Sequence, residues 1–422
     1  MPANHLVHFI LDAIASLDLT QVRVNTRGTG SEQYPPAMLL ALLLYSYATG
    51  TFSSRRIEQS TYDSVPVRLL TADTHPDHDT LCTFRRENQA LLSASFVQVL
   101  QLAQALKLLQ VGQLTVAADG TKVLAHASKH SAVSYERAGE LIQELELEVQ
   151  PLLAKAEQAD RTPRQAGLTI PEEIVRREER KAALAKARTE IEARAHARYT
   201  AQLAEHEQKL AERAAKAAQG EPARGKVPAA PTPTPDPQDQ YNFTDAESRI
   251  MKAGNGQHFE QGYNAQAAVE VDSRLIVGKR VSQSPNDKQE LVPTVAAIPV
   301  EVGSVSGVLV DSGFFSAVAV SAVEAAADGT PSGTMVYAAV EKTGHHRSVS
   351  DLEVQPEPAL PPAGASAKEV MRHRLKTPAG KALYKLRQQT VEPVFGIIKS
   401  VLGFRQFLLR GLGLEPADRL DQ

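Results

Sequence analysis

Three acidic residues stand where carboxylates could carry out metal-dependent chemistry. Asp119 follows a short apolar stretch in AADGTK, Asp311 follows another in VLVDSGFF, and Glu392 lies in the segment TVEPVFGIIK. Acids at the C-terminal ends of strands can meet at one edge of a sheet. Carboxylates gathered there would repel one another unless a cation neutralised them, and oxygen ligands with open positions suit Mg²⁺. The three acids therefore predict a metal site, and two ions about 4 Å apart would support phosphodiester chemistry.

Each acid also has a structural interpretation. Asp119 begins a common Asp-Gly turn pair, and Asp311 could cap the helix that follows it. Glu392 could be a first-turn acid with Pro393 at the first helical position, or half of a solvated salt bridge with Lys399. The order of the elements favours the metal site. A strand with Asp precedes a hairpin and a helix, and a second strand with Asp precedes a late helix with Glu.

The segment around Glu392 is basic, although the whole chain has a net charge of −3. Between Lys368 and Arg410 there are ten lysines and arginines against two acids, so this segment carries about +8. Such a local patch favours an anionic partner. Seven residues, or two helical turns, separate Glu392 from Lys399, which predicts that both lie on one flank of the helix. Apolar residues that recur at spacings of three and four would dock this helix: Val391, Val394, Phe395, Ile398 and Leu402.

The elements that must position these acids change character along the 422 residues. The N-terminal part reads as short helices with paired arginines, which suit a DNA-binding bundle and an ordinary helical domain equally well. Later segments alternate between predicted strands and helices, which is typical of a layered α/β fold. The predicted parts are a helical N-terminal DNA-binding domain (1–110), the first part of an α/β core (111–134), a helical-hairpin insertion (135–218), a Pro-rich linker (219–240), the remainder of the core (241–410) and a short irregular tail (411–422).

Composition excludes several classes of protein. The chain is 42% hydrophobic and 23% charged, so it has enough apolar residues for a sizeable core. Its single cysteine, Cys82, excludes an internal disulfide and a zinc site built from four cysteines. The N-terminus lacks the features of a signal peptide, and the best apolar run, at 38–48, is too short to span a bilayer. We therefore expect a cytoplasmic protein.

Several stretches together resemble one family of enzymes. They are HPDHDTLCTFRREN at 75–88, DGTKVLAHASKHSAVSYER at 119–137, NFTDAESRIM at 242–251, QGYNAQAAVEVDSRLIVG at 261–278, SPNDKQEL at 284–291, VDSGFFS at 310–316 and RLKTPAGKALYKLRQQTVEPVFGIIK at 374–399. In these stretches the chain resembles the bacterial insertion-sequence DDE transposases, which belong to the retroviral-integrase superfamily and have an RNase H-like core. The likeness covers most of the chain outside residues 140–240 and the last ten or so residues.

The resemblance implies a fold, a reaction and partners. The core would be an RNase H-like mixed sheet with flanking helices, joined to an all-α N-terminal domain and the long helical insertion. Asp119, Asp311 and Glu392 would be both the catalytic triad and the ligands of two Mg²⁺ (or Mn²⁺) ions. The enzyme would cleave DNA at the transposon's terminal inverted repeats and join the freed 3′-hydroxyl to target DNA. It would act as a homodimer on DNA and associate with the bacterial nucleoid when bound.

Five residues are candidate DNA contacts. Relatives carry a Tyr-x2-Arg-x3-Glu-x6-Lys signature on the last helix, which Tyr384, Arg387, Glu392 and Lys399 match except that four residues separate the Arg from the Glu. At 100° per residue that spacing puts the two side chains about 140° apart on a straight helix. A bend near the following proline could restore the alignment. The other two candidates, Lys122 and Lys129, could contact phosphate as point charges or belong to a solvated loop.

Two alternatives to a transposase remain at this point. The same acids could serve a metal-dependent nuclease or phosphohydrolase that performs no strand transfer. The chain could also be a catalytically inactive remnant that only binds DNA, because relatives usually continue past FRQFLLRGL into another helix. We therefore expect a shortened tail at 411–422, whose effect on activity is left open. A requirement for Mg²⁺ or Mn²⁺ together with paired terminal repeats would favour the transposase.

Overall fold

The computed structural model divides the chain into two compact units, Met1–His126 with Met251–Gln422, and Ala127–Ile250. The first unit carries the three predicted acids. Most of the predicted tail and the first part of the predicted linker lie outside the described residues. The structure describes residues 1–2, 4–20, 22–23, 33–109, 112–160, 170–218, 227–253, 258–326, 330–340, 360–362 and 365–412.

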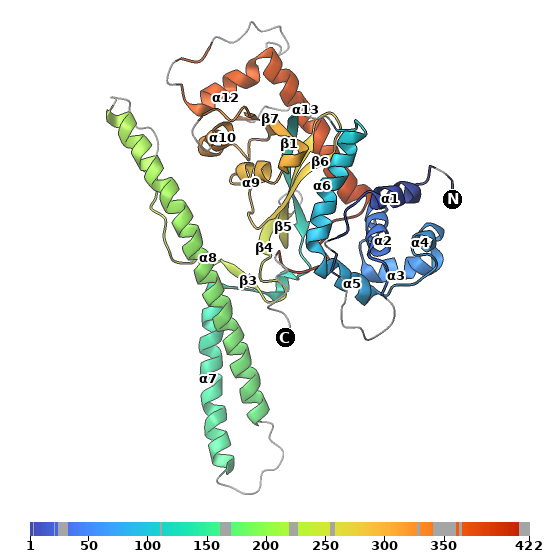
Figure 1. Cartoon of the computed structure of the whole chain (residues 1–422). Coiled ribbons are helices and arrows are strands. Elements are labelled where there is room, and N and C mark those ends of the chain that lie inside the picture. Colours follow the sequence, from blue (N-terminus) through green and yellow to red (C-terminus); the bar gives the residue numbers. More distant parts are fainter. Residues whose placement is uncertain are drawn as a thin grey trace. The chain divides into compact units, whose positions relative to one another are not determined.

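The N-terminal part of the first unit is helical (Figure 1). Its helices are α1 (Leu6–Ala15), α2 (Pro36–Ala48), α3 (Ser54–Asp63), α4 (Val65–Leu70), α5 (His78–Glu87) and α6 (Gln89–Ala105). Pro36 occupies the first position of α2, where its missing N–H costs no helical hydrogen bond. Asp77 caps α5 by accepting a 2.6 Å hydrogen bond from the backbone N–H of Thr80. In the described residues, no helix combines the length and the apolar character that crossing a membrane requires.

A six-stranded mixed sheet follows, in the order β4-β5-β1-β7-β8, with β6 also paired to β5. The strand β1 runs antiparallel to β5 and parallel to β7, and β7 runs parallel to β8. The sheet and its flanking helices agree with the mixed α/β architecture that the sequence predicts. The strands are β1 (Gln113–Leu124), β4 (Arg249–Ala253), β5 (His258–Glu270), β6 (Ile276–Ser282), β7 (Ser304–Val310) and β8 (Met335–Ala338).

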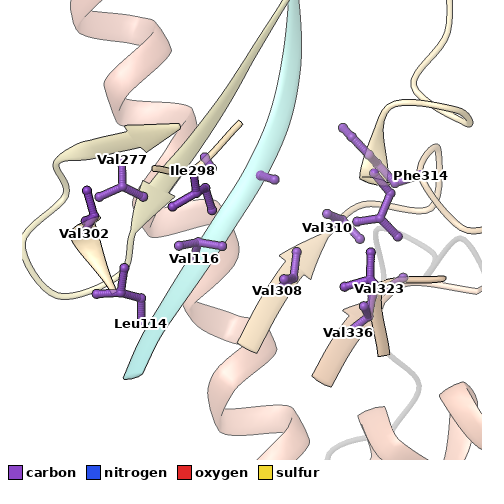
Figure 2. Packing of buried hydrophobic residues seen from close by; sticks show 14 of the residues in the cluster. Leu114, Val116, Val277, Ile298, Val302, Val308, Val310, Phe314, Val323 and Val336 are labelled. Atoms are coloured by element: carbon purple, nitrogen blue, oxygen red, sulfur yellow. The ribbon is translucent and has the colours of Figure 1, made fainter. Parts of the chain in front are cut away.

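Apolar side chains cover both faces of this sheet. On one face, Val116 of β1 packs in a cluster with Val308 of β7 and Val336 of β8, as Figure 2 shows. Residues from helices α6, α9 (Leu291–Ala296), α10 (Ala317–Glu324) and α12 (Ala367–Lys376) complete this cluster. On the other face, Ala117 of β1 packs with Val391 of α13 (Pro378–Gly396). Neighbouring residues of β1 therefore point to opposite helical layers, as the strand period of two requires.

The strand β1 extends beyond the point where the sequence predicts its end. Pairing with β5 continues as far as Leu124, which faces Gly262. Pairing with β7 ends earlier, at Ala117 and Leu309. The interpretation of Asp119 as the start of a reverse turn is therefore wrong, because the residue is held in extended backbone by β5. It lies where β1 is still paired on one side and no longer paired with β7 on the other.

The helix that carries Glu392 begins much earlier than a first-turn interpretation requires. Helix α13 begins at Pro378, after Thr377, whose side chain caps it, and Pro393 lies inside it. Glu392 therefore lies about four turns beyond the start of the helix, and its interpretation as a first-turn acid is wrong. From residue 397 the helix continues as a π-helical turn, η3 (Ile397–Val401). Val391, Val394 and Phe395 belong to the apolar cluster that docks α13 on the sheet.

The residues after η3 form backbone hydrogen bonds with the last residue of β1. The backbone N–H of Leu124 donates to the carbonyl of Arg405 at 3.0 Å, and that of Phe407 donates to the carbonyl of Leu124 at 2.8 Å. The ring of Phe404 lies edge-on to that of Phe52 in the helical part, with 4.9 Å between centroids. The segment FRQF therefore ties β1 to the helical part of the same unit.

The second unit consists mainly of two long helices, α7 (Tyr135–Asp160) and α8 (Ile170–Ala218), that lie alongside each other (Figure 1). Lys181 pairs with Glu146 at 3.1 Å and Arg177 pairs with Glu148 at 2.9 Å, so the helices run antiparallel. A small apolar cluster closes one end of the pair. The short strands β2 (Ala132–Ser134) and β3 (Gln240–Asn242) pair beside it.

Candidate active site

Two of the three predicted acids lie at adjacent parallel strands. Asp119 is two residues beyond Ala117, where the pairing of β1 with β7 ends, and Asp311 directly follows Val310, the last residue of β7. Because Ala117 faces the α13 layer, strand alternation turns Asp119 toward the same layer. The two carboxylates therefore come from neighbouring strand ends, on the side of the sheet that α13 covers.

The carboxylate of Asp119 is largely buried, with 20% of its side chain exposed. The backbone N–H of Gly120 donates to its Oδ1 at 2.8 Å. Burial raises the pKa of Asp119 from 3.8 to about 6; the charges of Asp311 and Asp287 also raise it, whereas the Gly120 N–H and Arg387 lower it. A buried carboxylate surrounded by other carboxylates is a common feature of a functional site.

Asp311 is held by a local turn. Its Oδ1 accepts a 2.7 Å hydrogen bond from the backbone N–H of Gly313, and the next residue, Phe314, is fully buried. Helix α10 begins only at Ala317, with Ser316 at its N-cap position. The interpretation of Asp311 as the cap of the following helix is therefore wrong. Its turn leaves the side chain partly exposed beside the sheet.

Arg387 connects the first and third predicted acids. Its Nη1 donates to Asp119 Oδ2 and its Nη2 donates to Glu392 Oε1, both at 3.4 Å. The residue is only 9% exposed, whereas 52% of the Glu392 side chain is exposed. The 140° separation that a straight helix predicts between Arg387 and Glu392 does not keep them apart, because the long arginine side chain spans the interval. Arg387 thus directs its guanidinium toward the carboxylates.

Lys399 lies in the π-helical turn and contacts β1. Its ammonium donates to the backbone carbonyl of Lys122 at 2.7 Å. Burial lowers the pKa of Lys399, and the nearby charges of Arg405 and Lys122 lower it further. A regular α-helix would place Lys399 two turns after Glu392 on the same flank, but the wider π turn changes this phase. In this structure the ammonium anchors α13 to the strand that carries Asp119.

Tyr384 packs in the apolar cluster under α13. Burial raises the pKa of its hydroxyl; Arg387 lowers it, and the charge of Asp311 raises it. Tyr384 thus lies within electrostatic reach of Asp311 and of the arginine that joins the other two acids. Of the predicted signature, Arg387 therefore contacts Asp119 and Glu392, and Tyr384 lies near Asp311.

The remaining predicted DNA contacts lie elsewhere. The Nζ of Lys122 is buried, and burial lowers the pKa of this group. The charges of Asp287, Glu290 and Asp119 raise that pKa. Lys129 is exposed and lies in a 3-10 turn, η1 (Lys129–Ser131), of the second unit. The two lysines that follow Asp119 in the sequence therefore have different surroundings.

Some of the cations in the basic segment form contacts within the protein. Arg374 of α12 forms an ion pair with Glu324 of α10, in addition to the internal contacts of Arg387 and Lys399. Four lysines of α12 and α13 are exposed: Lys368, Lys376, Lys381 and Lys385. In the sequence they are distinguished only as members of the basic segment. The sequence pattern alone did not separate the exposed cations from the internal ones.

The chemistry of the donor set fits a divalent cation, although the side chains are not gathered as a metal shell. Among the described residues, no three His, Cys, Asp or Glu side chains lie close enough together to hold one ion. The acids offer only hard oxygen ligands, as Mg²⁺ and Mn²⁺ prefer. The guanidinium of Arg387 lies within 3.4 Å of both Asp119 and Glu392, so a cationic group already occupies the place between them.

Two parts of the chain match models of protein families. Residues 1–87 match a family described as a transposase domain (DUF772), and residues 354–414 match a family described as a transposase DDE domain. Both matches are to transposase families, and together they indicate an insertion-sequence DDE transposase. The second match supports a DNA-cleaving enzyme, and it contains α13 with Glu392. Comparison of the chain with curated proteins and with solved structures found no match.

Proposed function

We propose that this transposase catalyses cut-and-paste transposition with Asp119, Asp311 and Glu392 as its catalytic triad. In the first step, water attacks a phosphodiester at the transposon end, and the bond to the 3′-oxygen breaks to leave a free 3′-hydroxyl. In the second step, that hydroxyl attacks a target phosphodiester and the target's own 3′-oxygen leaves. Neither step forms a covalent bond to the enzyme.

The observation that carries this proposal is that one arginine contacts two of the acids, beside the strand end that carries the third. Asp119 and Asp311 come from the ends of adjacent parallel strands, and Glu392 comes from the helix packed against them. Arg387 contacts Asp119 and Glu392 at 3.4 Å. The charges of Asp311 and Asp287 raise the pKa of Asp119, and the charge of Arg387 lowers it. Such an arrangement favours binding of cations over binding of a neutral ligand.

DDE transposases generally depend on divalent metal ions, and we propose Mg²⁺ or Mn²⁺, two ions, held by these three acids. Bound metal would lower the pKa of the attacking water or hydroxyl and stabilise the leaving oxygen. The protein's own groups have other tasks. The Gly120 N–H orients Asp119, and Lys399 fixes α13 to β1 through the Lys122 carbonyl.

We also propose that the core is RNase H-like. Three antiparallel strands, β6, β5 and β1, are followed by β7 and β8, which run parallel to β1. Exposed lysines on α12 and α13, among them Lys381 and Lys385, would contact phosphates beside the carboxylates. The DNA partners would be the terminal inverted repeats and the target. Two transposon ends would be paired by a homodimer.

Cleavage of end DNA tests the triad. Duplexes carrying the inverted repeats that flank the gene are incubated with Mg²⁺ and either wild type, Asp311→Asn or Glu392→Gln. We expect losses of about a thousand-fold or more in both variants, since each removes a charge that acts at the reacting phosphate. The exposed carboxylate Glu301 supplies the matched control, Glu301→Gln, which should cleave at the wild-type rate. Equal cleavage by wild type and Glu392→Gln would contradict the assignment.

The products separate the proposed reaction from its alternatives. A transposase yields joined end and target DNA, and it needs both ends in one complex. A nuclease yields cleaved ends without joined products, at a rate that is independent of a second end. An inactive DNA-binding protein shifts the end duplex in a gel but yields neither product. Light scattering of the complex with DNA tests the dimer.

A further inference from the structure

Two stretches that resemble the family, QGYNAQAAVEV and SPNDKQEL, have no part in the triad. Asp287 of the second stretch lies over the first. Its Oδ1 accepts hydrogen bonds from Asn264 Nδ2 and from Gln266 Nε2, both at 2.7 Å. Asn264 is fully buried and Gln266 is 2% exposed. We call these three residues the amide clasp.

The amide clasp closes over Gly120 of β1. In the sheet, Gly120 faces Gln266 and Lys122 faces Asn264, so these side chains share one face. A Cβ atom on Gly120 would lie 2.3 Å from Gln266 Nε2, 2.4 Å from Asp287 Oδ1 and 2.8 Å from Asn264 Oδ1. The backbone of Gly120 is not in the left-handed region, so the glycine is required for space. The clasp therefore packs directly on the backbone of β1.

Gly120 in turn orients the carboxylate of Asp119. Its N–H donates to Asp119 Oδ1 at 2.8 Å, on the opposite face of the strand from the clasp. At this point β1 has lost its pairing with β7, which ends at Ala117. Of the strand ladders, the one to β5 still holds it there. A support that presses on Gly120 from the far face therefore limits the movement of the Asp119 carboxylate.

Asp287 is the acceptor that the two amide side chains of the clasp share. Among the described residues, the carbonyl oxygens of the Asn264 and Gln266 side chains are buried without a hydrogen-bond partner. Each amide is therefore held through its N–H group, and Asp287 accepts from both. Loss of this acceptor would leave two buried amides free to turn, and buried polar groups without partners are costly. The packing on Gly120 would loosen as a result.

We propose that Asp287 is a positioning residue for cleavage, which acts on Asp119 through the amide clasp and Gly120. This inference rests on the proposed role of Asp119 in the triad. Through the amide clasp, the stretches QGYNAQAAVEV and SPNDKQEL would both support the position of Asp119. A shift of about 1 Å in a catalytic group can cost on the order of 100-fold in rate. We therefore expect loss of the clasp to lower kcat by about this factor while KM for end DNA stays near its wild-type value.

The test compares Asp287→Ala with Asp287→Asn. The amide oxygen of asparagine can still accept from both clasp residues, so Asp287→Asn should keep cleavage within about three-fold of wild type. Asp287→Ala should lose about 100-fold in kcat. Glu290→Gln is the matched control, because Glu290 is a buried carboxylate of the same stretch that contacts Arg280 and Ser282 instead of the clasp. It should lower the melting temperature but leave kcat unchanged at temperatures where the protein is folded.

Amide hydrogen exchange supplies a readout that does not depend on activity. Asp287→Ala should speed exchange in residues 117–124, and Glu290→Gln should not. If wild type fails to cleave end DNA, the proposed function fails, and exchange alone decides whether the clasp holds β1. Unchanged exchange in Asp287→Ala would overturn the proposal. An equal loss of kcat in Asp287→Asn and Asp287→Ala would also overturn it, since the charge would then matter instead of the clasp.

Discussion

Replacing Asp119 by asparagine should stabilise the folded protein while abolishing cleavage. Burial raises the pKa of Asp119 to about 6 from its ordinary value of 3.8. Because the folded-state pKa lies above the unfolded-state value, the folded state binds more protons between pH 4 and pH 6. The free energy of unfolding therefore falls as pH rises through this window. Above pH 6, Asp119 is ionised in both states, and the loss in the free energy of unfolding reaches its full value.

The size of the effect follows from the pKa difference. A difference of about 2 units corresponds to about 3 kcal/mol. Solvent at the exposed fifth of the side chain reduces the gain, so we expect about 1 to 2 kcal/mol from Asp119→Asn at pH 7.5. For a unit of this size that is a rise of about 2 to 4 °C in melting temperature. The asparagine oxygen can still accept from the Gly120 N–H.

Thermal and urea unfolding at two pH values measure this prediction. At pH 4.5 Asp119 is mostly protonated in the folded state, so the advantage of Asp119→Asn should shrink to about a third of its value at pH 7.5. Asp63→Asn is the matched control, because Asp63 is exposed, and its effect should stay within about 0.5 kcal/mol at both pH values. A variant that is less stable than wild type at pH 7.5 would refute the reasoning. So would a gain of equal size at both pH values.

Two further substitutions test the contacts of α13. Arg387→Gln removes the cation between Asp119 and Glu392, so it should destabilise the protein at pH 7.5 by about 2 kcal/mol and by less at pH 4.5, as measured by urea unfolding. A loss that is independent of pH would mean that Arg387 contributes packing alone. Lys399→Met removes the 2.7 Å bond to the Lys122 carbonyl and should cost about 1 to 2 kcal/mol and lower the rate of end cleavage. Unchanged stability in Lys399→Met would show that this bond does not anchor the helix.

The sequence by itself determined the elements and the chemical types at the site. Alternating strand and helix segments predicted the layered α/β fold, and spacings of three and four predicted the docking face of α13 at Val391, Val394 and Phe395. These patterns are readable because burial depends on local periodicity. The order of the elements in the sequence also singled out Asp119, Asp311 and Glu392.

Only the tertiary structure decided what these side chains contact. An Asp-Gly pair is a turn in isolation, but the ladder to β5 keeps Asp119 in a strand that continues to Leu124. The angles of a straight helix place Arg387 away from Glu392, but the long arginine side chain reaches it. The same angles place Lys399 on the flank of Glu392, but the π turn directs Lys399 to the carbonyl of Lys122. These outcomes depend on pairing partners and packing distances that residues far apart in the chain supply.

The amide clasp is the clearest case of this division. The sequence shows glycine, asparagine, glutamine and aspartate in three separate stretches, and none of them has a spacing that predicts a contact. They meet because β1 and β5 pair in one register and the segment before α9 crosses their face. Residue types determine which hydrogen bonds are possible. The register of the sheet decides which of them form, because a shift of one residue would turn every side chain to the other face.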